Sequence, residues 1–402
     1  MDVALLFTTR IVRLFAYGFV SIVLVLYLSA IGLDEHRIGL LLTLTLVGDV
    51  AVSLYLTTRA DRIGRRRTLF AGALLMVGAA IVFALTRDFT LLLLAATIGV
   101  ISPSGNEVGP FLAVEQVALT EAASDRDRTN LFAWYNLSGS FATAIGSLAG
   151  GALTGFLLTR GYSTATSYRS VLFGYALLGL VLAVIFARLS PKIEGAPHEA
   201  ESRTFFRVHR SRGVVFRLSG LFALDSFAGG LVVQSVMAFW FARRFGLSPA
   251  ILGSIFFGAN VLAGVSALAA ASLARKFGLL NTMVFTHLPS NILLLLVPFM
   301  PTLALAIAVL LLRFSISQMD VPTRQSYVMA VVDPSERTAA AGITGVARTT
   351  GAALAPILAV PLIAGHNSWL PFVAAGVLKI VYDIALLFGM RKQAAEASTA
   401  AR

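Results

Sequence analysis

Cysteine is absent from this chain of 402 residues, and its absence excludes disulfide bonds and thiolate metal ligands. Charged residues are scarce as well, since Asp, Glu, Lys and Arg together make up only 13% of the sequence. The five histidines are scattered, and no two have the i,i+3 or i,i+4 spacing that places two ligands on one helix face. There is no nucleotide-binding P-loop and no Ser/His/Asp arrangement in a suitable context. We therefore expect no metal, no cofactor and no enzymatic activity.

Hydrophobic residues make up 57% of the sequence, and the mean hydropathy of +0.83 is typical of a membrane protein rather than a soluble one. Apolar runs long enough to cross a hydrocarbon core of about 30 Å recur along the whole chain. We predict an all-α membrane protein with twelve transmembrane helices. The predicted spans are 5–31, 39–58, 68–86, 90–118, 130–157, 168–188, 214–240, 249–273, 280–299, 302–331, 339–364 and 369–390.

The distribution of Lys and Arg predicts the orientation of these spans. Twenty of these residues lie in the loops on one side and six in the loops on the other. Because Lys and Arg near a span are held on the cytoplasmic side, we predict that both termini are cytoplasmic, in the cell inner membrane. The net charge of +12 has the same origin, so we expect no nucleic-acid partner. The first apolar run contains Arg10 and Arg13 and no cleavage site follows it, which indicates a retained helix rather than a signal peptide.

The longest polar stretch, residues 189–213, divides the spans into six plus six. We predict an N-terminal six-helix bundle at 1–188, a cytoplasmic linker at 189–213 and a C-terminal six-helix bundle at 214–402. Residues match across the divide at an offset of 209 around spans 4, 5, 10 and 11, and at an offset of 212 in spans 1 and 7. The matches include Gln116 with Gln325, Ala144 with Ala353, and Gly18 with Gly230. Internal duplication of this kind is typical of secondary transporters.

A dense basic cluster, Asp61-Arg62-Ile63-Gly64-Arg65-Arg66-Arg67, lies between predicted spans 2 and 3. It matches most of the pattern G-x-x-x-D-R-x-G-R-R, with Thr57 in place of the leading glycine. In this motif and in its twelve spans the chain resembles the major facilitator superfamily over nearly all of its length. The resemblance implies two pseudo-symmetric six-helix bundles. It also implies that Asp61, Arg62 and Arg65 act in gating, by steadying the state that is closed to the cytoplasm.

The resemblance further implies a secondary active transporter that moves a small organic solute by alternating access, as a monomer in the lipid bilayer. Gly146, Gly150 and Gly151 partly match the glycine-rich segment of helix 5 in drug/proton antiporters, which favours efflux coupled to protons. Ser147 stands where that pattern has proline. Two alternatives remain open: a proton-coupled importer of an organic anion, and a non-transporting membrane sensor.

Apart from Arg169, Arg188 and Arg217, which lie near span ends and are counted with the loops, twelve ionisable residues fall inside the predicted spans, six of them basic and six acidic. Such groups are costly in hydrocarbon, at about 2.5–3.5 kcal/mol each, so they usually face a cavity or a partner and carry function. Eight of the twelve lie on helices 1, 4, 7 and 10, which in the superfamily line the central cavity. The twelve are Arg10, Arg13, Asp49, Glu107, Glu115, Asp225, Arg313, Asp320, Arg324, Arg348, Lys379 and Asp383.

These charges and one aromatic residue supply the candidate site. The candidates for substrate binding and proton coupling are Arg13, Tyr17, Glu107, Asp225, Arg313, Asp320 and Arg348. Asp225 and Glu107 are the candidate proton carriers, and the alternative for both is a permanently ionised partner of an arginine. Arg348 either reaches the cavity or neutralises Asp320.

The repeat also predicts pairs among the charges. Its offsets place Glu115 opposite Arg324 near the cytoplasmic ends, which predicts a gating pair between the two halves. The alternative is pairing inside each half, of Arg10 or Arg13 with Glu115, and of Asp320 with Arg324 at i,i+4. Lys379 and Asp383 also have i,i+4 spacing, and we interpret them as a structural pair.

Overall fold

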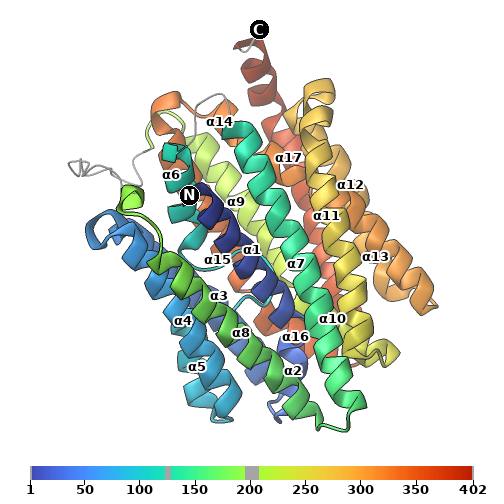
Figure 1. The fold of residues 1–402 in the computed structure, drawn as a ribbon. Coiled ribbons are helices and arrows are strands. Elements are labelled where there is room, and N and C mark those ends of the chain that lie inside the picture. The colour runs from blue at the N-terminus through green and yellow to red at the C-terminus, as the bar shows by residue number, and fades with distance from the viewer. Residues whose placement is uncertain (1, 123–127, 195–207, 401–402) are drawn as a thin grey trace. The chain divides into compact units, whose positions relative to one another are not determined.

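The computed structural model describes residues 2–122, 128–194 and 208–400, and every regular element within them is a helix (Figure 1). The predicted all-α fold class is therefore confirmed. Up to residue 194 the helices are α1 (Asp2–Ser21), α2 (Leu24–Ala30), α3 (Glu35–Ile63), α4 (Arg65–Leu85), α5 (Phe89–Ile98), α6 (Phe111–Ala122), α7 (Arg128–Thr159), α8 (Thr164–Ala187) and the 3-10 helix η1 (Pro191–Glu194). From residue 208 they are α9 (Arg212–Gly230), α10 (Gln234–Phe245), α11 (Pro249–Phe277), α12 (Leu279–Leu296), η2 (Val297–Phe299), α13 (Leu303–Ser317), α14 (Asp320–Val331), η3 (Pro334–Glu336), α15 (Arg337–Ala353), α16 (Pro356–Ala364) and α17 (Leu370–Ala400).

Eleven stretches of helix in the described residues are long and apolar enough to cross a membrane, and they coincide with eleven of the twelve predicted spans. The remaining span, predicted at 90–118, consists of the shorter apolar helices α5 and α6, joined by residues 99–110 without helix. The prediction of twelve spans is thereby confirmed. Glu107 lies in this non-helical segment.

Proline and glycine account for the break between α5 and α6. Pro103 and Pro110 lack the backbone N–H that a helix interior needs. Gly105 and Gly109 have φ angles of 71° and 83°, a left-handed conformation that favours glycine. Spans 1, 7, 10 and 11 each consist of two helices in succession as well. Backbone groups freed by such breaks are tolerated at membrane depth only beside protein or a water-filled cavity.

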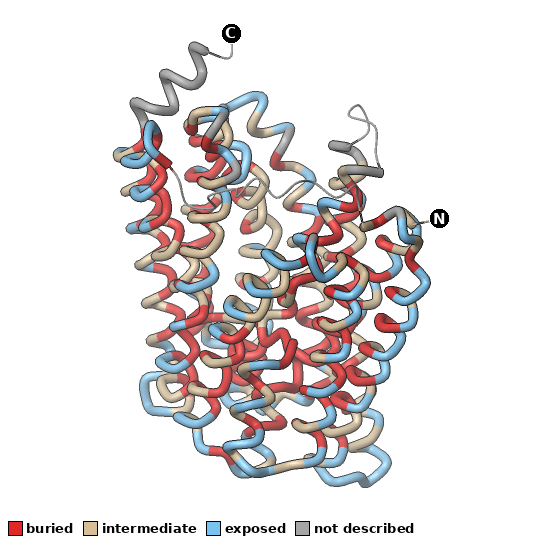
Figure 2. Tube along the Cα trace, turned by 90° about the vertical axis from the view of Figure 1, so that its left-hand side faces the viewer, coloured by how far each residue is buried: buried red, intermediate tan, exposed pale blue. Residues whose placement is uncertain are grey.

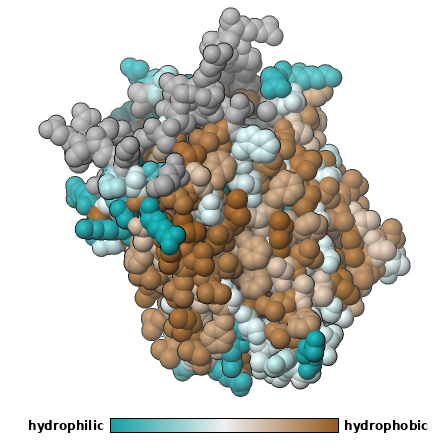
Figure 3. All heavy atoms as spheres, in the orientation of Figure 1, coloured by the Kyte–Doolittle hydropathy of each residue, from teal (hydrophilic) through white to brown (hydrophobic). Residues whose placement is uncertain are grey.

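Large apolar side chains are exposed along the helices. Leu85, Trp134, Leu177, Phe285 and Phe388 are between 62% and 72% exposed. Buried and exposed turns alternate along the same helices (Figure 2), and hydrophobic atoms cover most of the helix sides in the face drawn in Figure 3. An exposed apolar surface of this extent indicates contact with lipid, which agrees with a multi-pass membrane protein.

The chain divides into two compact units, of which unit 1 comprises Met1–Glu199, Val233–Val261 and Pro356–Ala364. In unit 1, α1 packs against α7 and α8, α4 packs against α8, and α3 packs against α5 and α16. Helix α10 packs against α2 and α16. Unit 1 therefore contains the first six spans together with short pieces from the second half of the sequence. The division into bundles at 1–188 and 214–402 stays a prediction.

Unit 2 comprises Ala200–Val232, Leu262–Ala355 and Gly365–Arg402. Its main helix pairs are α9 with α15, α9 with α17, and α12 with each of α13, α14 and α17. The core between these helices is built from large apolar side chains, among them Phe222, Met283, Tyr327, Tyr382 and Leu386. Charged side chains inside this unit are thus surrounded by apolar groups and depend on one another for partners.

Two glycines at equivalent places in the repeat bring helix backbones close together. A Cβ on Gly18 of α1 would lie 2.1 Å from the carbonyl oxygen of Thr143 in α7. A Cβ on Gly230 of α9 would lie 2.4 Å from the carbonyl oxygen of Ala352 in α15. Thr143 and Ala352 are separated by the offset of 209, as Gly18 and Gly230 are by 212. The same helix contact therefore occurs once in each unit.

This close contact predicts that Gly230→Ala and Gly18→Ala lower the melting temperature, because a methyl group fits only if the paired helices move apart. Overpacking of this kind costs about 1–3 kcal/mol. Gly220→Ala, in the same helix as Gly230, is the matched control, since nothing lies within 4 Å of its Cβ position. We expect it to leave Tm unchanged or to raise it, because Ala favours a helix over Gly by about 1 kcal/mol. Thermal unfolding of the purified proteins in detergent measures the difference, and equal Tm values for Gly230→Ala and Gly220→Ala would contradict the prediction.

Candidate functional site

The non-helical segment between α5 and α6 carries Glu107 towards α1. Side chains satisfy the backbone groups that the helix break frees. The Tyr17 hydroxyl donates to the carbonyl oxygen of Val108 at 2.9 Å, and the Tyr175 hydroxyl donates to that of Val100 at 3.0 Å. Tyr17 is fully buried, so the structure places this candidate against protein. Its bond helps to fix the segment from which Glu107 reaches the arginines of α1.

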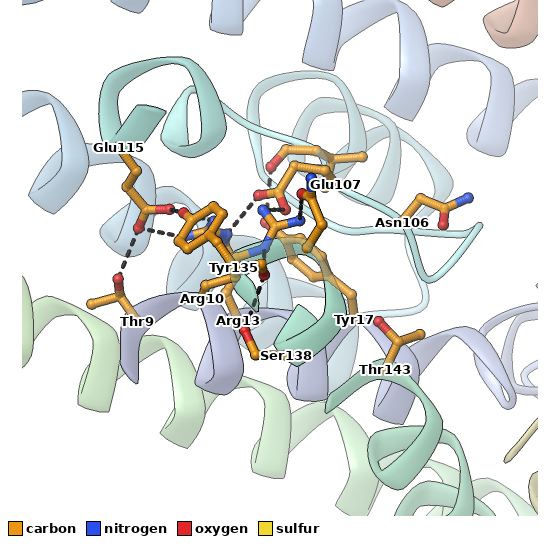
Figure 4. A network of polar contacts seen from close by, with 12 residues as sticks. Thr9, Arg10, Arg13, Tyr17, Asn106, Glu107, Glu115, Tyr135, Ser138 and Thr143 are labelled. Carbon is orange, nitrogen blue, oxygen red and sulfur yellow. Dashed lines mark hydrogen bonds and ion pairs between the residues drawn. The ribbon is translucent and has the colours of Figure 1, made fainter. Parts of the chain in front are cut away.

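Arg13 of α1 is fully buried between two carboxylates (Figure 4). Its Nε donates to Glu107 Oε1 at 2.7 Å, while Nη1 and Nη2 donate to Glu115 Oε1 and Oε2 at 2.8 and 2.7 Å. A bidentate arginine–carboxylate pair of this kind combines a strong interaction with a fixed geometry. Glu115 also accepts hydrogen bonds from the hydroxyls of Thr9, at 2.8 Å, and Tyr135. The network thus ties α1, α6 and α7 together.

Arg10 lies one turn before Arg13 and binds the other oxygen of Glu107. Its Nη1 donates to Glu107 Oε2 at 3.0 Å, and its Nε donates to the carbonyl oxygen of Tyr135 at 2.9 Å. The absence of a side chain at Gly139 makes room for this guanidinium, because a Cβ there would lie 2.9 Å from Arg10 Nε. Glu107 keeps 15% of its side chain exposed, whereas Glu115 has 0%. Glu107 is therefore the accessible carboxylate of this network.

Asp49 on α3 binds the same broken segment without a cation. Its Oδ1 accepts from the backbone N–H of Gly109 at 2.5 Å and from the Ser53 hydroxyl at 3.2 Å. Within the described part of the chain Asp49 forms no ion pair, whereas Glu107, Glu115, Asp225 and Asp320 each pair with an arginine and Asp383 contacts His287. Glu107 lies close enough to Asp49 to repel it electrostatically. Sequence reasoning did not single out Asp49, because Gly109 is 60 residues away.

In unit 2, Asp225 of α9 is buried among cationic groups. Lys379 Nζ donates to its Oδ1 at 2.6 Å, and Arg324 Nη1 donates to its Oδ2 at 3.1 Å. Arg324 also pairs with Asp320 at 3.2 Å, as the i,i+4 spacing predicted. Cations at both oxygens favour the ionised carboxylate, which is the alternative that the sequence left open for Asp225. Asp320 is neutralised by Arg324 rather than by Arg348.

Lys379 and Asp383 are not paired with each other in the described ion pairs, so that expectation was wrong. Lys379 reaches Asp225 on α9 instead. Asp383 Oδ1 lies 2.9 Å from His287 Nδ1, and Asp383 Oδ2 accepts from the Asn291 amide at 2.9 Å. Both partners lie on α12, which packs against α17. Asp383 is therefore bound by residues of a neighbouring helix and not by Lys379 on its own helix. The i,i+4 spacing of His287 and Asn291 inside an apolar span is the sequence signal that could have revealed this cluster.

The two halves contain equivalent ion pairs of opposite polarity. Arg13 and Asp225 are equivalent by the offset of 212, and Glu115 and Arg324 by the offset of 209. Arg13 binds Glu115 in unit 1, and Asp225 binds Arg324 in unit 2. Each pair joins the first span of its half to the fourth. The structure thus contains the pairs inside each half, and a gating pair of Glu115 with Arg324 stays a prediction.

Two of the twelve intramembrane charges, Arg313 and Arg348 of unit 2, have no carboxylate partner among the residues that the structure describes. Arg313 of α13 and Arg348 of α15 form no ion pair or hydrogen bond there, and the Nε of each is buried. The ring of Phe314 lies 4.9 Å from Arg313 Cζ. Both guanidiniums are within electrostatic reach of Asp225 and Asp320.

A cluster of amide and hydroxyl groups in unit 1 surrounds Gln234 at the start of α10. Gln234 Nε2 donates to the hydroxyls of Ser21 at 2.8 Å and Ser147 at 3.0 Å, and its Oε1 accepts from the Asn260 amide at 3.0 Å. The next residue, Ser235, donates its N–H to the carbonyl oxygen of Pro103 at 3.1 Å. Sequence reasoning missed this cluster, since neutral polar residues inside spans carry no charge signal.

The glycines that resemble the antiporter pattern lie at close helix contacts of α7. A Cβ on Gly146 would lie 2.0 Å from the carbonyl oxygen of Phe15, and a Cβ on Gly150 would lie 2.2 Å from that of Phe19. A Cβ on Gly151 would lie 2.3 Å from the carbonyl oxygen of Pro249, at the start of α11. These glycines therefore allow α7 to pack closely on both α1 and α11.

Glu194 binds the basic cluster 61–67 at the point where α4 begins. Its carboxylate accepts from the backbone N–H groups of Arg65 at 2.5 Å and Arg66 at 3.3 Å, in the first turn of α4, where a negative charge is favoured. The buried guanidinium of Arg65 donates to the carbonyl oxygen of Ile193 at 3.1 Å. Arg62 is exposed, and the side chain of Asp61 lies outside the described residues. The cluster is thus tied to the segment after α8.

Glu336 makes a comparable contact at the start of α9. Its Oε1 accepts from the backbone N–H groups of His209 at 2.6 Å and Arg210 at 2.9 Å, and its Oε2 accepts from that of Ser211 at 2.8 Å. These hydrogen bonds stabilise the carboxylate and lower the pKa of Glu336 from 4.5 to about 2.

A family model described as Major Facilitator Superfamily matches residues 6–356 of the chain. The chain belongs to this superfamily. A Saccharomyces cerevisiae protein named "Uncharacterized membrane protein YJR124C" is 30% identical over 417 residues, which cover 96% of this chain and 93% of that protein.

Solved structures of other proteins share the fold of this superfamily member. A bacterial homologue of the human lysosomal transporter Spinster, in an inward-facing and unoccupied conformation, has a TM-score of 0.74 at 15% identity, covering 98% of this chain and 97% of that chain. A D-xylose–proton symporter has a TM-score of 0.72 at 17% identity, covering 96% of each chain. The chain is thus a major facilitator superfamily transporter and not an enzyme.

The Glu336 contact predicts a pH-dependent effect of Glu336→Gln on the stability of this transporter. Because the folded-state pKa of about 2 lies below the ordinary value of 4.5, the carboxylate stabilises the fold above about pH 4.5. This contribution is lost as the pH falls from about 4.5 towards 2. Glu336→Gln should therefore lower Tm at pH 7, and the Tm difference from wild type should shrink below pH 4.5. Thermal unfolding between pH 7 and pH 3 measures it, and a difference that stays constant over this range would contradict the prediction.

Proposed function

We propose that the chain is a proton-coupled secondary transporter of a small organic solute that works by alternating access. The observation that carries this proposal is the environment of Asp49, whose described partners are a backbone N–H and a hydroxyl but no cation. A coupling group has to bind and release a proton in every cycle. A carboxyl that no fixed cation keeps ionised suits this task better than the paired carboxylates do.

The contacts of Asp49 link proton binding to the position of Glu107, which binds Arg10 and Arg13. A hydrogen bond to an ionised acceptor is roughly twice as strong as a neutral one, so protonation of Asp49 weakens its hold on the N–H of Gly109. It also removes the repulsion between Asp49 and Glu107. Both changes act on the non-helical segment 99–110. The proton therefore alters the position of Glu107 relative to Arg10 and Arg13.

The cluster around Gln234 supports the alternating-access part of the proposal. It joins helix segments from both halves of the sequence through neutral hydrogen bonds. Each such bond contributes only about 0.5–1.5 kcal/mol, which suits a contact that breaks and re-forms in every cycle. We assign this cluster to the outer side, with both chain ends in the cytoplasm and the protein in the cell inner membrane. The excess of Lys and Arg in the loops on the side of the chain ends supports this orientation.

Two directions of coupling are supported by different observations. Export in exchange for protons is favoured by Gly146, Gly150 and Gly151, through their resemblance to drug/proton antiporters. Import together with protons is favoured by the arginines without carboxylate partners, Arg313 and Arg348, because an organic anion would neutralise them. The direction of solute movement relative to proton flow separates the two.

Asp49→Asn should abolish transport driven by a pH gradient while leaving solute exchange intact. Asn can still accept the hydrogen bond of Gly109, so the fold is retained, but it cannot bind a proton. The measurement is radiolabelled solute flux in proteoliposomes, with a solute selected by its ability to raise Tm of the purified protein. Ser53→Ala is the matched control, because it removes the other hydrogen bond of Asp49 and keeps the carboxyl. Unchanged pH-driven flux in a well-folded Asp49→Asn protein would contradict the proposal.

The same proteoliposomes determine the direction of coupling. With acid outside, an antiporter releases solute from the vesicles and a symporter accumulates it, whichever way the protein is inserted. Absence of any flux or exchange in wild type would favour the sensor instead.

A further inference from the structure

Apart from the exposed Arg217 near the start of its span, unit 2 contains more cations than carboxylates inside its spans. The cations are Arg313, Arg324, Arg348 and Lys379, and the carboxylates are Asp225, Asp320 and Asp383. The three carboxylates are already engaged, Asp225 and Asp320 by Arg324, Asp225 also by Lys379, and Asp383 by His287. Among these residues, Arg313 and Arg348 are the two cations without a carboxylate partner in the described part of the chain.

These two guanidiniums cannot lose their charge to become compatible with an apolar interior. Arginine remains protonated in proteins, whereas a buried lysine or carboxyl can be neutralised. An unpaired charge at membrane depth is costly and marks a substrate or ion pathway unless a partner is found. The buried Nε of each residue has no hydrogen-bond acceptor in the described part of the chain. Both side chains are therefore available to an acceptor that is not part of the chain.

Arg313 and Arg348 share the same charged neighbours. Arg313 and Arg348 are both within reach of Asp225 and Asp320, and Arg348 is also close enough to Arg324 to be repelled by it. Arg313 lies four residues before the end of α13, and Arg348 lies five residues before the end of α15. In both spans a second helix follows after a short break. The arginines thus occupy comparable positions, each near an interruption in its span.

We propose that Arg313 and Arg348 bind the anionic group of the transported solute, a small organic anion with a carboxylate or phosphate group. The planar donor fork of arginine matches both groups, which accept two parallel hydrogen bonds. This inference rests on the proposed function for the statement that the bound anion is the transported solute. It is independent of the coupling role of Asp49.

Ligand-dependent unfolding of the purified chain in a neutral detergent tests the proposal. The probes are benzoate, citrate and glycerol 3-phosphate, with benzyl alcohol and glycerol as neutral counterparts, at an ionic strength matched with potassium chloride. We expect at least one of the anions to raise Tm in a saturable way and the neutral compounds to have no such effect. If no anion stabilises wild type, or if a neutral counterpart does so equally, the proposal is overturned.

Substitutions assign the binding to the two arginines. Arg313→Gln and Arg348→Gln should each weaken the apparent affinity for the anion about tenfold or more, the usual effect of losing a charge-assisted hydrogen bond. Arg275→Gln, which changes an exposed arginine of the same unit, should leave the affinity unchanged. Arg313→Lys and Arg348→Lys keep the charge and should show a smaller loss, which covers the case in which a Gln variant does not fold. Equal affinities of all variants and wild type would overturn the assignment.

A lipid headgroup presents the same phosphate chemistry as a solute, so a further arm adds phosphatidylglycerol. An arginine-dependent Tm rise with this lipid, and none with the soluble anions, would overturn the proposal in favour of a lipid site. Failure of the proposed function gives a different pattern, namely arginine-dependent anion binding without pH-driven flux. The converse, pH-driven flux of a solute without arginine-dependent anion binding, would overturn the anion site alone.

Discussion

A charged side chain inside a lipid-facing protein has to find a partner of opposite charge, and the contact of Arg13 with Glu107 and Glu115 meets this constraint in unit 1. Removing one partner of a buried pair typically costs about 3–5 kcal/mol, a large part of the 5–15 kcal/mol that stabilises most proteins. This contact depends on the break in span 4, because an unbroken helix would not bring both Glu107 and Glu115 to one guanidinium. The backbone groups freed by the break are in turn satisfied by Tyr17, Tyr175 and Asp49.

Helix packing allows the equivalent pair in unit 2 to have the opposite polarity. The distance between the first and fourth spans of each half depends on where the helices lie, and small residues such as Gly18 and Gly230 set close approaches of the first span to the fifth. Charge complementarity needs only one cation and one carboxylate at the two positions, whichever comes first. Arg13 with Glu115 and Asp225 with Arg324 satisfy the same geometry with exchanged signs. The repeat is thus more visible in backbone contacts than in residue identities.

Sequence patterns predicted the features that depend on residues close together in the chain. Span lengths follow from runs of apolar residues, the break in span 4 follows from Pro103, Gly105, Gly109 and Pro110, and the Asp320–Arg324 pair follows from one helical turn. Partners on different helices could not be predicted in this way, because they depend on how each helix is rotated about its axis. Lys379 shows the limit, since an acid one turn away at Asp383 was less well placed than Asp225, 154 residues distant. Neutral groups such as Gln234 and Asn291 escaped notice because their partners, rather than their composition, make them important.

Charge balance links proton binding to anion binding without requiring a contact between the two units. Around the break in span 4, unit 1 has Arg10 and Arg13 against Asp49, Glu107 and Glu115, a local surplus of one negative charge. Away from the span ends, unit 2 has Arg313, Arg324, Arg348 and Lys379 against Asp225, Asp320 and Asp383, a local surplus of one positive charge when His287 is neutral. Under the proposed roles, a proton on Asp49 neutralises the first cluster and a bound monoanion neutralises the second. The charges of the two clusters then sum to zero both in the empty and in the doubly loaded protein, whereas a protein with one ligand alone carries an unbalanced charge at membrane depth, which is disfavoured. For a monoanion this difference favours movement of solute and proton in the same direction, so the charge of the solute itself decides which direction of coupling these residues support.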